Sequence, residues 1–175
     1  MRGNDGIIGL LNEVLTAELT AVSQYFLHSK MMENWGYLRL AAHTKHESID
    51  EMKHADEVTD RILFFGGTPN YQRYFPLHIG ETVPEQFQAD LELEYTAVER
   101  LSRGIAAATA AGDNGTGLVQ AHPRRREEHH IDWLETQIET IRQIGAELYL
   151  ARSSCTTDRR LPGLWGNRPV GMFRS

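Results

Sequence analysis

The feature of this chain that most constrains its fold is a spacing of acidic residues and histidines that occurs twice. A glutamate is followed 33 residues later by a Glu-x-x-His motif, and the same arrangement recurs 76 positions further along the chain. On a helix, residues i and i+3 share a face, so each motif directs one carboxylate and one imidazole to a single point. The residues are Glu18, Glu51 and His54 in the first copy, and Glu94, Glu127 and His130 in the second. The repeat predicts four helices around a pair of metal ions.

Four long segments show the 3.6-residue period of helices with a buried face, and the Gly and Pro residues fall between them. The predicted long helices cover residues 5–34, 37–65, 84–111 and 117–145, and a short one covers 146–152. Pro123 lies inside the fourth segment, where it removes a backbone hydrogen bond. The pattern therefore does not define the first turns of that helix.

The connector between the second and third helices, residues 66–83, is too long for a hairpin turn between neighbouring antiparallel helices. A connector of this length runs along the bundle, as the single crossover of ferritin-like bundles does. We therefore expect an all-α, ferritin-like four-helix bundle with one long crossover and a short C-terminal helix. One domain covers residues 1–152, and residues 153–175 form an irregular tail rich in Gly, Arg, Pro and Ser.

The composition is ordinary for a soluble protein, with 24% charged residues and a net charge of −6, and it gives no sign of nucleic-acid binding. No apolar run approaches the ~20 residues of a membrane span, and the N-terminus lacks the apolar core of a signal peptide. We expect a cytoplasmic protein that does not contact membranes. The single cysteine, Cys155, excludes an internal disulfide, and we assign it no role.

The glutamates of the repeat lie in register with apolar residues that face the core. Glu94 falls on the stripe of Leu91 and Leu101, and Glu18 falls on that of Leu11 and Leu15. Buried carboxylates need compensating charge, and the predicted core offers no Lys or Arg at this level. Two divalent cations match four carboxylates better than partial protonation does, so we prefer a metal site to glutamates on solvated helix faces. Oxygen and nitrogen ligands without thiolate favour iron or manganese.

From Met1 to about Tyr149 the chain resembles bacterioferritins, and the resemblance extends beyond the six ligands. The matching segments are residues 24–28, 46–56, 61–64 and 130–136. The resemblance implies iron storage and detoxification in a hollow shell of 24 subunits built from dimers. In such a shell a ferroxidase centre within each subunit oxidises Fe(II) with oxygen or peroxide, ferric mineral is deposited inside, and a ferredoxin-type reductant assists iron release.

The resemblance also implies a role for each residue of the repeat in binding two iron ions per subunit. By similarity, Glu51 and Glu127 bridge the irons, Glu18 and Glu94 are terminal carboxylates, and His54 and His130 each bind one iron. Tyr25, one heptad beyond Glu18, either supplies an electron or forms a hydrogen bond to a ligand carboxylate.

Members of the family also bind haem b between two subunits, with one methionine from each as axial ligand, and Met52 matches that residue. Met52 points about 100° away from Glu51 around the helix, toward another surface. Without the resemblance, a methionine on a helix is more often a core residue. His46 and Asp50 match residues associated with iron at the inner surface of the shell, although their spacing of four also allows a local contact on a solvated face.

Residues 121–126, Ala-His-Pro-Arg-Arg-Arg, depart from the family, in which a continuous helix leads into the second Glu-x-x-His motif. A one-base shift of suitable codons for residues 122–126 yields Ile-Leu-Ala-Asp-Glu, which restores the helical pattern. Compensating frame shifts or a genuine local change therefore explain the departure, and peptide masses without the three arginines would support the former. The tail from about Ala151 departs as well.

Three other functions fit parts of the sequence. A di-iron oxidase or peroxidase that acts on a small substrate without iron storage would need a further pocket. A DNA-protecting mini-ferritin places its ligands across subunits, whereas this chain carries a complete set. A haem-binding dimer would lack storage altogether.

Overall fold

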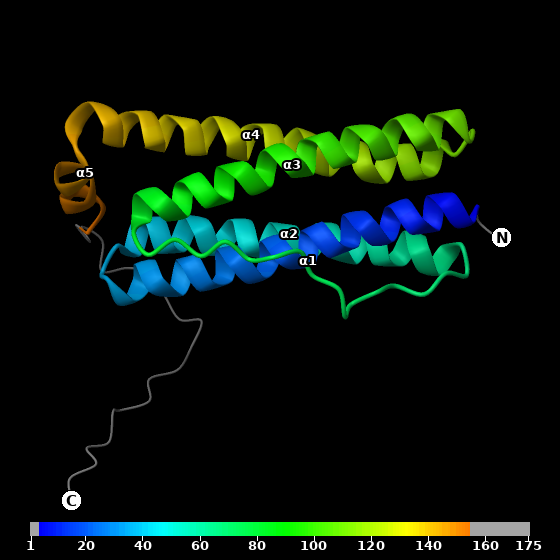
Figure 1. The fold of residues 1–175 in the computed structure, drawn as a ribbon, viewed down its shortest axis with the longest axis horizontal. Helices are drawn as coiled ribbons and strands as arrows, with labels where there is room; N and C mark the ends of the chain where they lie inside the picture. The colour runs from blue at the N-terminus through cyan, green and yellow to red at the C-terminus, as the bar shows by residue number, and fades with distance from the viewer. Residues whose placement is uncertain (1–3, 155–175) are drawn as a thin grey trace, which may run out of the picture.

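The chain folds into two helical hairpins that pack side by side (Figure 1). The computed structural model describes residues 4–154, apart from the side chain of His122. Over this range the helices are α1 (Asp5–Asn34), α2 (Leu38–Phe64), α3 (Val83–Ala110), α4 (Asn114–Ile144) and α5 (Ala146–Ser153). One hairpin pairs α1 with α2 and the other pairs α3 with α4, while α1 also contacts α3 across the bundle. The predicted all-α four-helix bundle is confirmed.

The helix bounds agree with the pattern except at the start of α4. The helix begins at Asn114, three residues before the predicted start, and it continues through Pro123. The Asp113 side chain caps this end by accepting from the Thr116 N–H at 3.1 Å and from Arg61 of α2 at 2.6 Å. Pro123 is buried, and the packing of α4 against α3 outweighs its missing hydrogen bond. The predicted tail lies outside the described residues from 155 onward, and Ser153 still belongs to α5.

Polar groups divide the core of the bundle into two apolar clusters. One cluster includes Leu11, Val58 and Leu101, and the other includes Met32 and Phe87. Along α2, α3 and α4 the glutamates and histidines of the repeat fall between these clusters, and on α1 Glu18 lies at the edge of the first cluster, next to Leu19. The bundle therefore holds its acidic layer near mid-length, with apolar packing on both sides.

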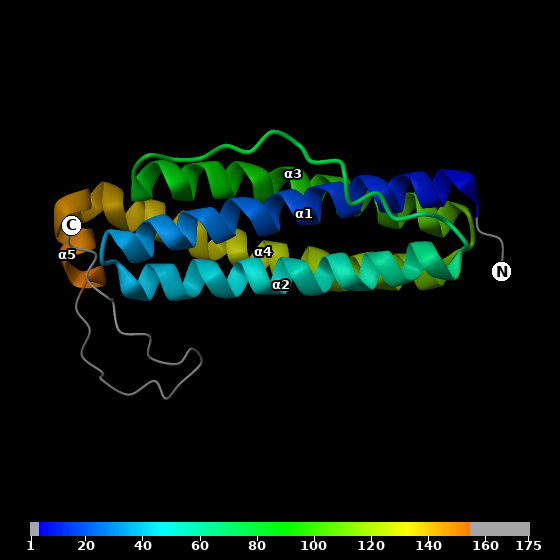
Figure 2. The same cartoon turned by 90° about the horizontal axis from the view of Figure 1, so that it is seen from below.

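The crossover of residues 65–82 runs along the bundle beside α1 and α3 and forms no strand (Figures 1 and 2). Three α1 side chains spaced four residues apart accept hydrogen bonds from its backbone N–H groups, at 3.0, 3.0 and 3.2 Å. The pairs are Thr20 with Phe75, Gln24 with His78, and His28 with Gly80. A Cβ on residue 80 would lie 2.3 Å from the Gln86 nitrogen, so the chain needs glycine there.

Asp90 of α3 completes this buried polar network. Gln24 Nε2 donates to Asp90 at 2.8 Å, and His28 Nδ1 lies 2.9 Å from the same oxygen. Because His28 Nε2 accepts from the backbone of Gly80, its Nδ1 carries the proton and donates to Asp90. Burial raises the pKa of Asp90, and the contacts with His28 and Gln24 offset part of that rise. One carboxylate thus ties α1, α3 and the crossover together.

Replacing Asp90 with alanine is expected to destabilise the fold by about 2–5 kcal/mol, because two buried donors lose their acceptor. At a few degrees per kcal/mol, the thermal midpoint should fall by roughly 5–15 °C. Asp60 of α2 is exposed, so Asp60→Ala is the matched control. Differential scanning calorimetry of both variants makes the comparison, and equal midpoints would contradict the role assigned to the network.

α1 is long and apolar enough to cross a membrane by length and composition alone, with a mean hydropathy of 1.3 in its most apolar window. The expectation from the sequence concerned an unbroken apolar run, and α1 is not one, because Glu13 and Glu18 lie within it. Half of that window is buried inside the bundle. The apolar face of α1 packs in the core of the bundle. The same helix also carries the buried polar side chains of Thr20, Gln24 and His28, which bind the crossover.

Candidate metal centre

All six side chains of the repeat lie inside the bundle, each no more than 7% exposed. The helices supply them in the predicted way, because one glutamate comes from α1, one from α3, and a Glu-x-x-His pair from each of α2 and α4. The i, i+3 spacing places both members of each pair on the core-facing side of its helix. The sequence register therefore predicted the position of these residues correctly.

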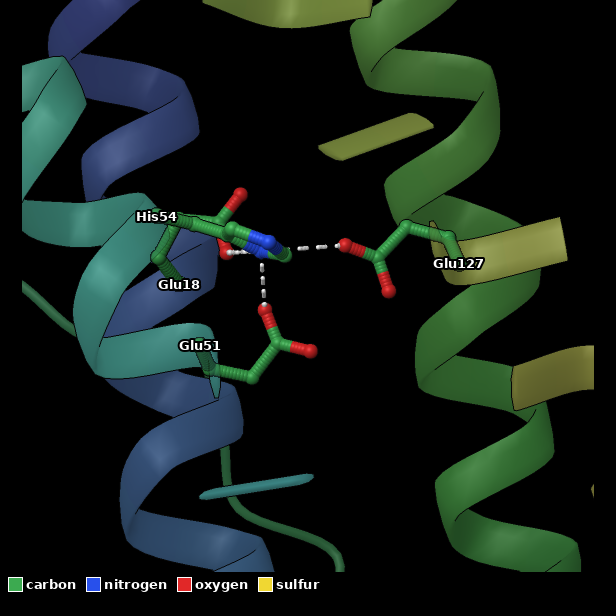
Figure 3. A group of neighbouring side chains, drawn as sticks. All are labelled: Glu18, Glu51, His54 and Glu127. Atoms are coloured by element: carbon green, nitrogen blue, oxygen red, sulfur yellow. Dashed lines mark hydrogen bonds and ion pairs between the residues drawn. The ribbon is translucent and has the colours of Figure 1, made fainter. Parts of the chain in front are cut away.

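Four of the six side chains form a compact group (Figure 3). One ligand atom from each of Glu18, Glu51, His54 and Glu127 lies within 4.8 Å of all the others. His54 Nδ1 is the centre of the group, at 3.0 Å from Glu51, 3.4 Å from Glu127 and 3.6 Å from Glu18. Glu127 reaches His54 from the opposite side of the bundle, as the figure shows. Carboxylates from three helices thus converge on one point.

Glu94 and His130 form the second half of the arrangement. His130 Nδ1 lies 2.7 Å from Glu94 Oε1, and the Tyr25 hydroxyl donates to the same oxygen. The Tyr25 ring also meets His130 edge-on at 5.4 Å between centroids. The predicted hydrogen bond from Tyr25 to a carboxylate of the repeat is confirmed, and the role of Glu94 as a metal ligand stays a prediction. The two halves interact electrostatically, because the negative charge of Glu94 raises the pKa of both Glu51 and Glu127.

The carboxylates of the cluster are buried close to one another, which disfavours their charged forms. Burial raises the pKa of Glu51 and Glu127 well above the ordinary value, and neighbouring carboxylates add to the rise. Burial alone lowers the pKa of His54, but its contacts with Glu127, Glu18 and Glu51 outweigh this and raise the pKa to about 12. Without metal, these shifts favour the protonated forms of the three groups, which reduces the repulsion between the carboxylates.

The residues present fit a pair of divalent cations. Among the described residues, no Lys or Arg forms an ion pair with any of the six side chains. His54 Nε2 and Glu127 Oε1 are buried without a hydrogen-bond partner within residues 4–154. Four carboxylates and two imidazoles on four helices make up the ligand set of di-iron carboxylate bundles. Hard oxygen donors with imidazole nitrogen suit iron or manganese.

Metal binding should release protons, because the ligands must be deprotonated, whereas in the metal-free cluster the pKa of His54 is raised to about 12 and burial raises the pKa values of Glu51 and Glu127. We expect roughly one proton or more per subunit at pH 7, since His54 alone supplies one. Affinity should weaken as pH falls, since protons then compete more strongly for the same atoms. Titration calorimetry with Co(II) in buffers of different ionisation enthalpy measures the proton count. Enthalpies that do not depend on the buffer would contradict this expectation.

Two cavities reach the centre from different sides. The cavity between α1, α3 and the crossover has a volume of about 260 Å³ and is lined by Glu18 and Glu94 together with Phe75 and Arg100. We call it the crossover cavity. A second cavity, between α2 and α4, has a volume of about 360 Å³ and includes His54 and His130 in its lining. We call it the α2–α4 chamber. Glu51 and Glu127 line both, so the metal centre lies between the two.

Met52 lies on a different face of α2 from the centre, as its sequence position predicts. Its side chain is 54% exposed and lines a shallow surface cavity together with Leu19, Ile49 and Tyr71. Leu19 and Ile49 supply apolar side chains beside the Met52 thioether. The placement is compatible with a surface shared between subunits, and the haem assignment stays a prediction.

His46 and Asp50 lie at the α2–α4 side of the bundle. His46 Nδ1 is 3.6 Å from Asp50 Oδ2, which is the local contact that their spacing allows. Asp50 also pairs with Lys53 at 2.6 Å and with Arg126 of α4 at 2.9 Å. Their role as iron ligands stays a prediction. The Arg126 contact could not be predicted from the sequence, because it joins residues of two helices that lie 76 positions apart in the chain.

Sequence reasoning did not single out His43. Its ring stacks on Trp133 at 3.7 Å between centroids and lines the α2–α4 chamber. Burial, with the nearby His130 and His46, lowers the pKa of His43 to about 4, so the imidazole is neutral at pH 7. The signal was present in the sequence, because Glu47 and His43 lie about one and two helical turns before Glu51 on the same side of α2.

Comparison with known proteins places this geometry in a family. A ferritin-like domain matches residues 8–144. Bacterioferritin BfrA of Mycobacterium tuberculosis is 52% identical over 152 residues, which cover 87% of this chain and 96% of that protein. The bacterioferritin of Streptomyces coelicolor is 50% identical over 151 residues, 86% of this chain and 90% of that protein.

A solved structure supports the same conclusion. Mycobacterium tuberculosis bacterioferritin BfrA superimposes with a TM-score of 0.87 at 51% identity, and the match covers 89% of this chain and 98% of that one. The family is thus shown both by sequence over most of the chain and by the arrangement of its helices. Together with the buried carboxylate and imidazole cluster, these matches show that the chain belongs to the bacterioferritin family of iron-storage proteins.

Proposed function

We propose that this protein is a ferroxidase that oxidises Fe(II) to Fe(III) at the buried centre and deposits ferric mineral inside a cytoplasmic shell of 24 subunits. The observation that carries the proposal is the layer of six buried ligand side chains without a Lys or Arg partner in the described part of the chain. A cluster of this kind is costly for the fold unless cations occupy it.

The two halves of the centre suit two iron ions that enter as substrate. Glu18 and His54 lie close enough together to bind one ion, and Glu94 and His130 to bind the other, which supports the proposal. Glu51 and Glu127 line both cavities beside the centre and are suited to bridge the ions. Each Fe(II) gives up one electron. Dioxygen takes two electrons and two protons to form hydrogen peroxide, or peroxide takes them to form two water molecules.

The protein contributes position, charge and proton transfer. Tyr25 fixes the orientation of the Glu94 carboxylate through its hydroxyl. His54 loses its proton when it becomes a metal ligand, and that proton is available to the reduced oxidant. The apolar clusters on both sides of the layer keep its ligand side chains buried, which strengthens the attraction between carboxylates and cations.

We also propose that Met52 binds haem b at a surface shared by two subunits. The support is its exposed thioether beside an apolar surface cavity, on a face of α2 separate from the metal centre. A haem at this position would carry electrons toward stored iron, with a ferredoxin-type protein as the reductant. Methionine ligation raises the reduction potential of haem iron, which suits an electron carrier.

Particle mass and iron uptake test the proposed function together. Purified protein should form a particle of 24 subunits by mass photometry. It should bind far more iron than two ions per subunit when Fe(II) is added in air. A small oligomer that retains no iron beyond the centre would overturn the storage proposal.

One observation favours a second function. The crossover cavity adjoins the metal ligands and has room for a small organic molecule at about 260 Å³. A di-iron oxidase or peroxidase without storage would use it. In that case the particle would take up no mineral, and Fe(II) would stay at two ions per subunit.

A further inference from the structure

A positively charged side chain, that of Arg126, lies at the mouth of the α2–α4 chamber. Arg126 Nη1 lies 2.9 Å from Asp50 Oδ2, so the ion pair links α4 to α2. Both residues line the chamber that contains the ligands His54 and Glu127. Apart from the centre itself, this pair is one of the few polar contacts that join these two helices in residues 4–154.

Both oxygens of Asp50 are engaged by cations. Lys53 Nζ lies 2.6 Å from Oδ1, and Arg126 lies on Oδ2, which His46 also approaches at 3.6 Å. The Asp50 side chain is only 9% exposed, so water does not compete strongly for it. While the guanidinium is in place, Asp50 has no free oxygen for a metal ion.

The Arg126 side chain is 45% exposed, and Lys53 stays on Asp50 to offset its charge, so the guanidinium can move into solvent at moderate cost. Once it leaves, the chamber wall offers donor atoms of the kind that cations prefer. Along α2, His43, His46, Glu47 and Asp50 recur at the spacing of one helix face. His43 Nε2 is buried without a hydrogen-bond partner in the described part of the chain and lies 3.7 Å from Glu47.

We infer that Arg126 is a gate at the mouth of the α2–α4 chamber. Its guanidinium occupies Asp50 in place of a metal cation, and divalent cations pass between the centre and this face of the bundle when it swings away. The inference rests on the proposed metal centre, because it concerns the route by which that centre exchanges ions. It assigns a role to a segment that departs from the family pattern.

The test follows the exchange of Co(II), which is coloured and does not react with oxygen under these conditions. The intact assembled protein is loaded with Co(II), and the loss of its absorption is followed by stopped flow after mixing with a chelator. Arg126→Gln should release Co(II) about three- to tenfold faster than wild type, since the half-exposed guanidinium contributes an ion pair of moderate strength.

A matched control separates the gate from a simple change of charge. Arg125→Gln removes the same charge one residue away, at an exposed position with no ion pair among the described residues. It should release Co(II) at the wild-type rate. If Arg126 acted only by repelling cations, Arg126→Gln would bind Co(II) more tightly and release it more slowly. A gate instead speeds binding and release together and leaves the dissociation constant nearly unchanged.

Asp50→Asn supplies an independent test, because it removes the partner that holds Arg126 in place. It should speed release as Arg126→Gln does, and the double variant should be no faster than either single one. Slower release in Asp50→Asn, or equal rates in Arg126→Gln, Arg125→Gln and wild type, would overturn the gate. The latter result would mean that exchange uses the crossover cavity. Wild-type protein that binds no Co(II) would instead overturn the metal centre.

Discussion

Glu94→Ala is expected to slow Fe(II) oxidation by on the order of 100-fold or more, because loss of even a supporting group at a metal site costs 10–100-fold. Glu94 is both a ligand and the acceptor for Tyr25 and His130, so its loss disorders the whole second half of the centre. Stopped-flow absorbance of ferric product measures the rate. Co(II) titration should show the stoichiometry falling from two ions per subunit to one.

The control for this variant is Glu99→Ala, which removes an exposed glutamate from the same helix. It should oxidise iron at the wild-type rate. Particle mass and circular dichroism of both variants establish that the fold and assembly are retained. A Glu94→Ala protein with intact assembly and wild-type oxidation would remove Glu94 from the centre.

Met52→Leu is expected to lower haem content more than about tenfold, because leucine keeps the volume of methionine but has no sulfur to bind iron. Met52 is exposed on α2, so the substitution leaves the core unchanged. The ratio of Soret to protein absorbance after haem reconstitution measures the effect. Met52→His should restore haem binding with a shifted spectrum, which separates a ligand from a packing residue.

The control here is Leu63→Ala, which trims an equally exposed apolar residue of α2. It should bind haem as wild type does. Unchanged haem content in Met52→Leu would contradict the assignment of the axial ligand, while leaving the metal centre unaffected.

The long helices were predictable because each one buries a single face, which the sequence records as apolar residues with a period of 3.6. The start of α4 was not, because Gly115 and Gly117 obscure the pattern and the Asp113 cap depends on Arg61 of a distant helix. A local pattern does not report a contact of that range. Pro123 misled for a similar reason, since its cost is offset by packing against α3.

The centre was predictable because its ligands share the register of the core, so the pattern that locates the apolar stripe also locates Glu18 and Glu94. The contacts around the ligands were harder to predict from the sequence. The Arg126–Asp50 pair and the anchoring of His28 to Asp90 join residues on different helices. Which residues meet in such pairs depends on how the helices pack against one another, and the periodicity of a single helix does not describe that packing.

The most direct test is anomalous X-ray scattering at the iron edge from crystals soaked anaerobically in Fe(II). Two peaks per subunit are expected inside the bundle. One should lie within bonding distance of Glu18 and His54, the other of Glu94 and His130, and both should contact Glu51 and Glu127. A bundle interior without peaks, while iron collects elsewhere on the protein, would contradict the account.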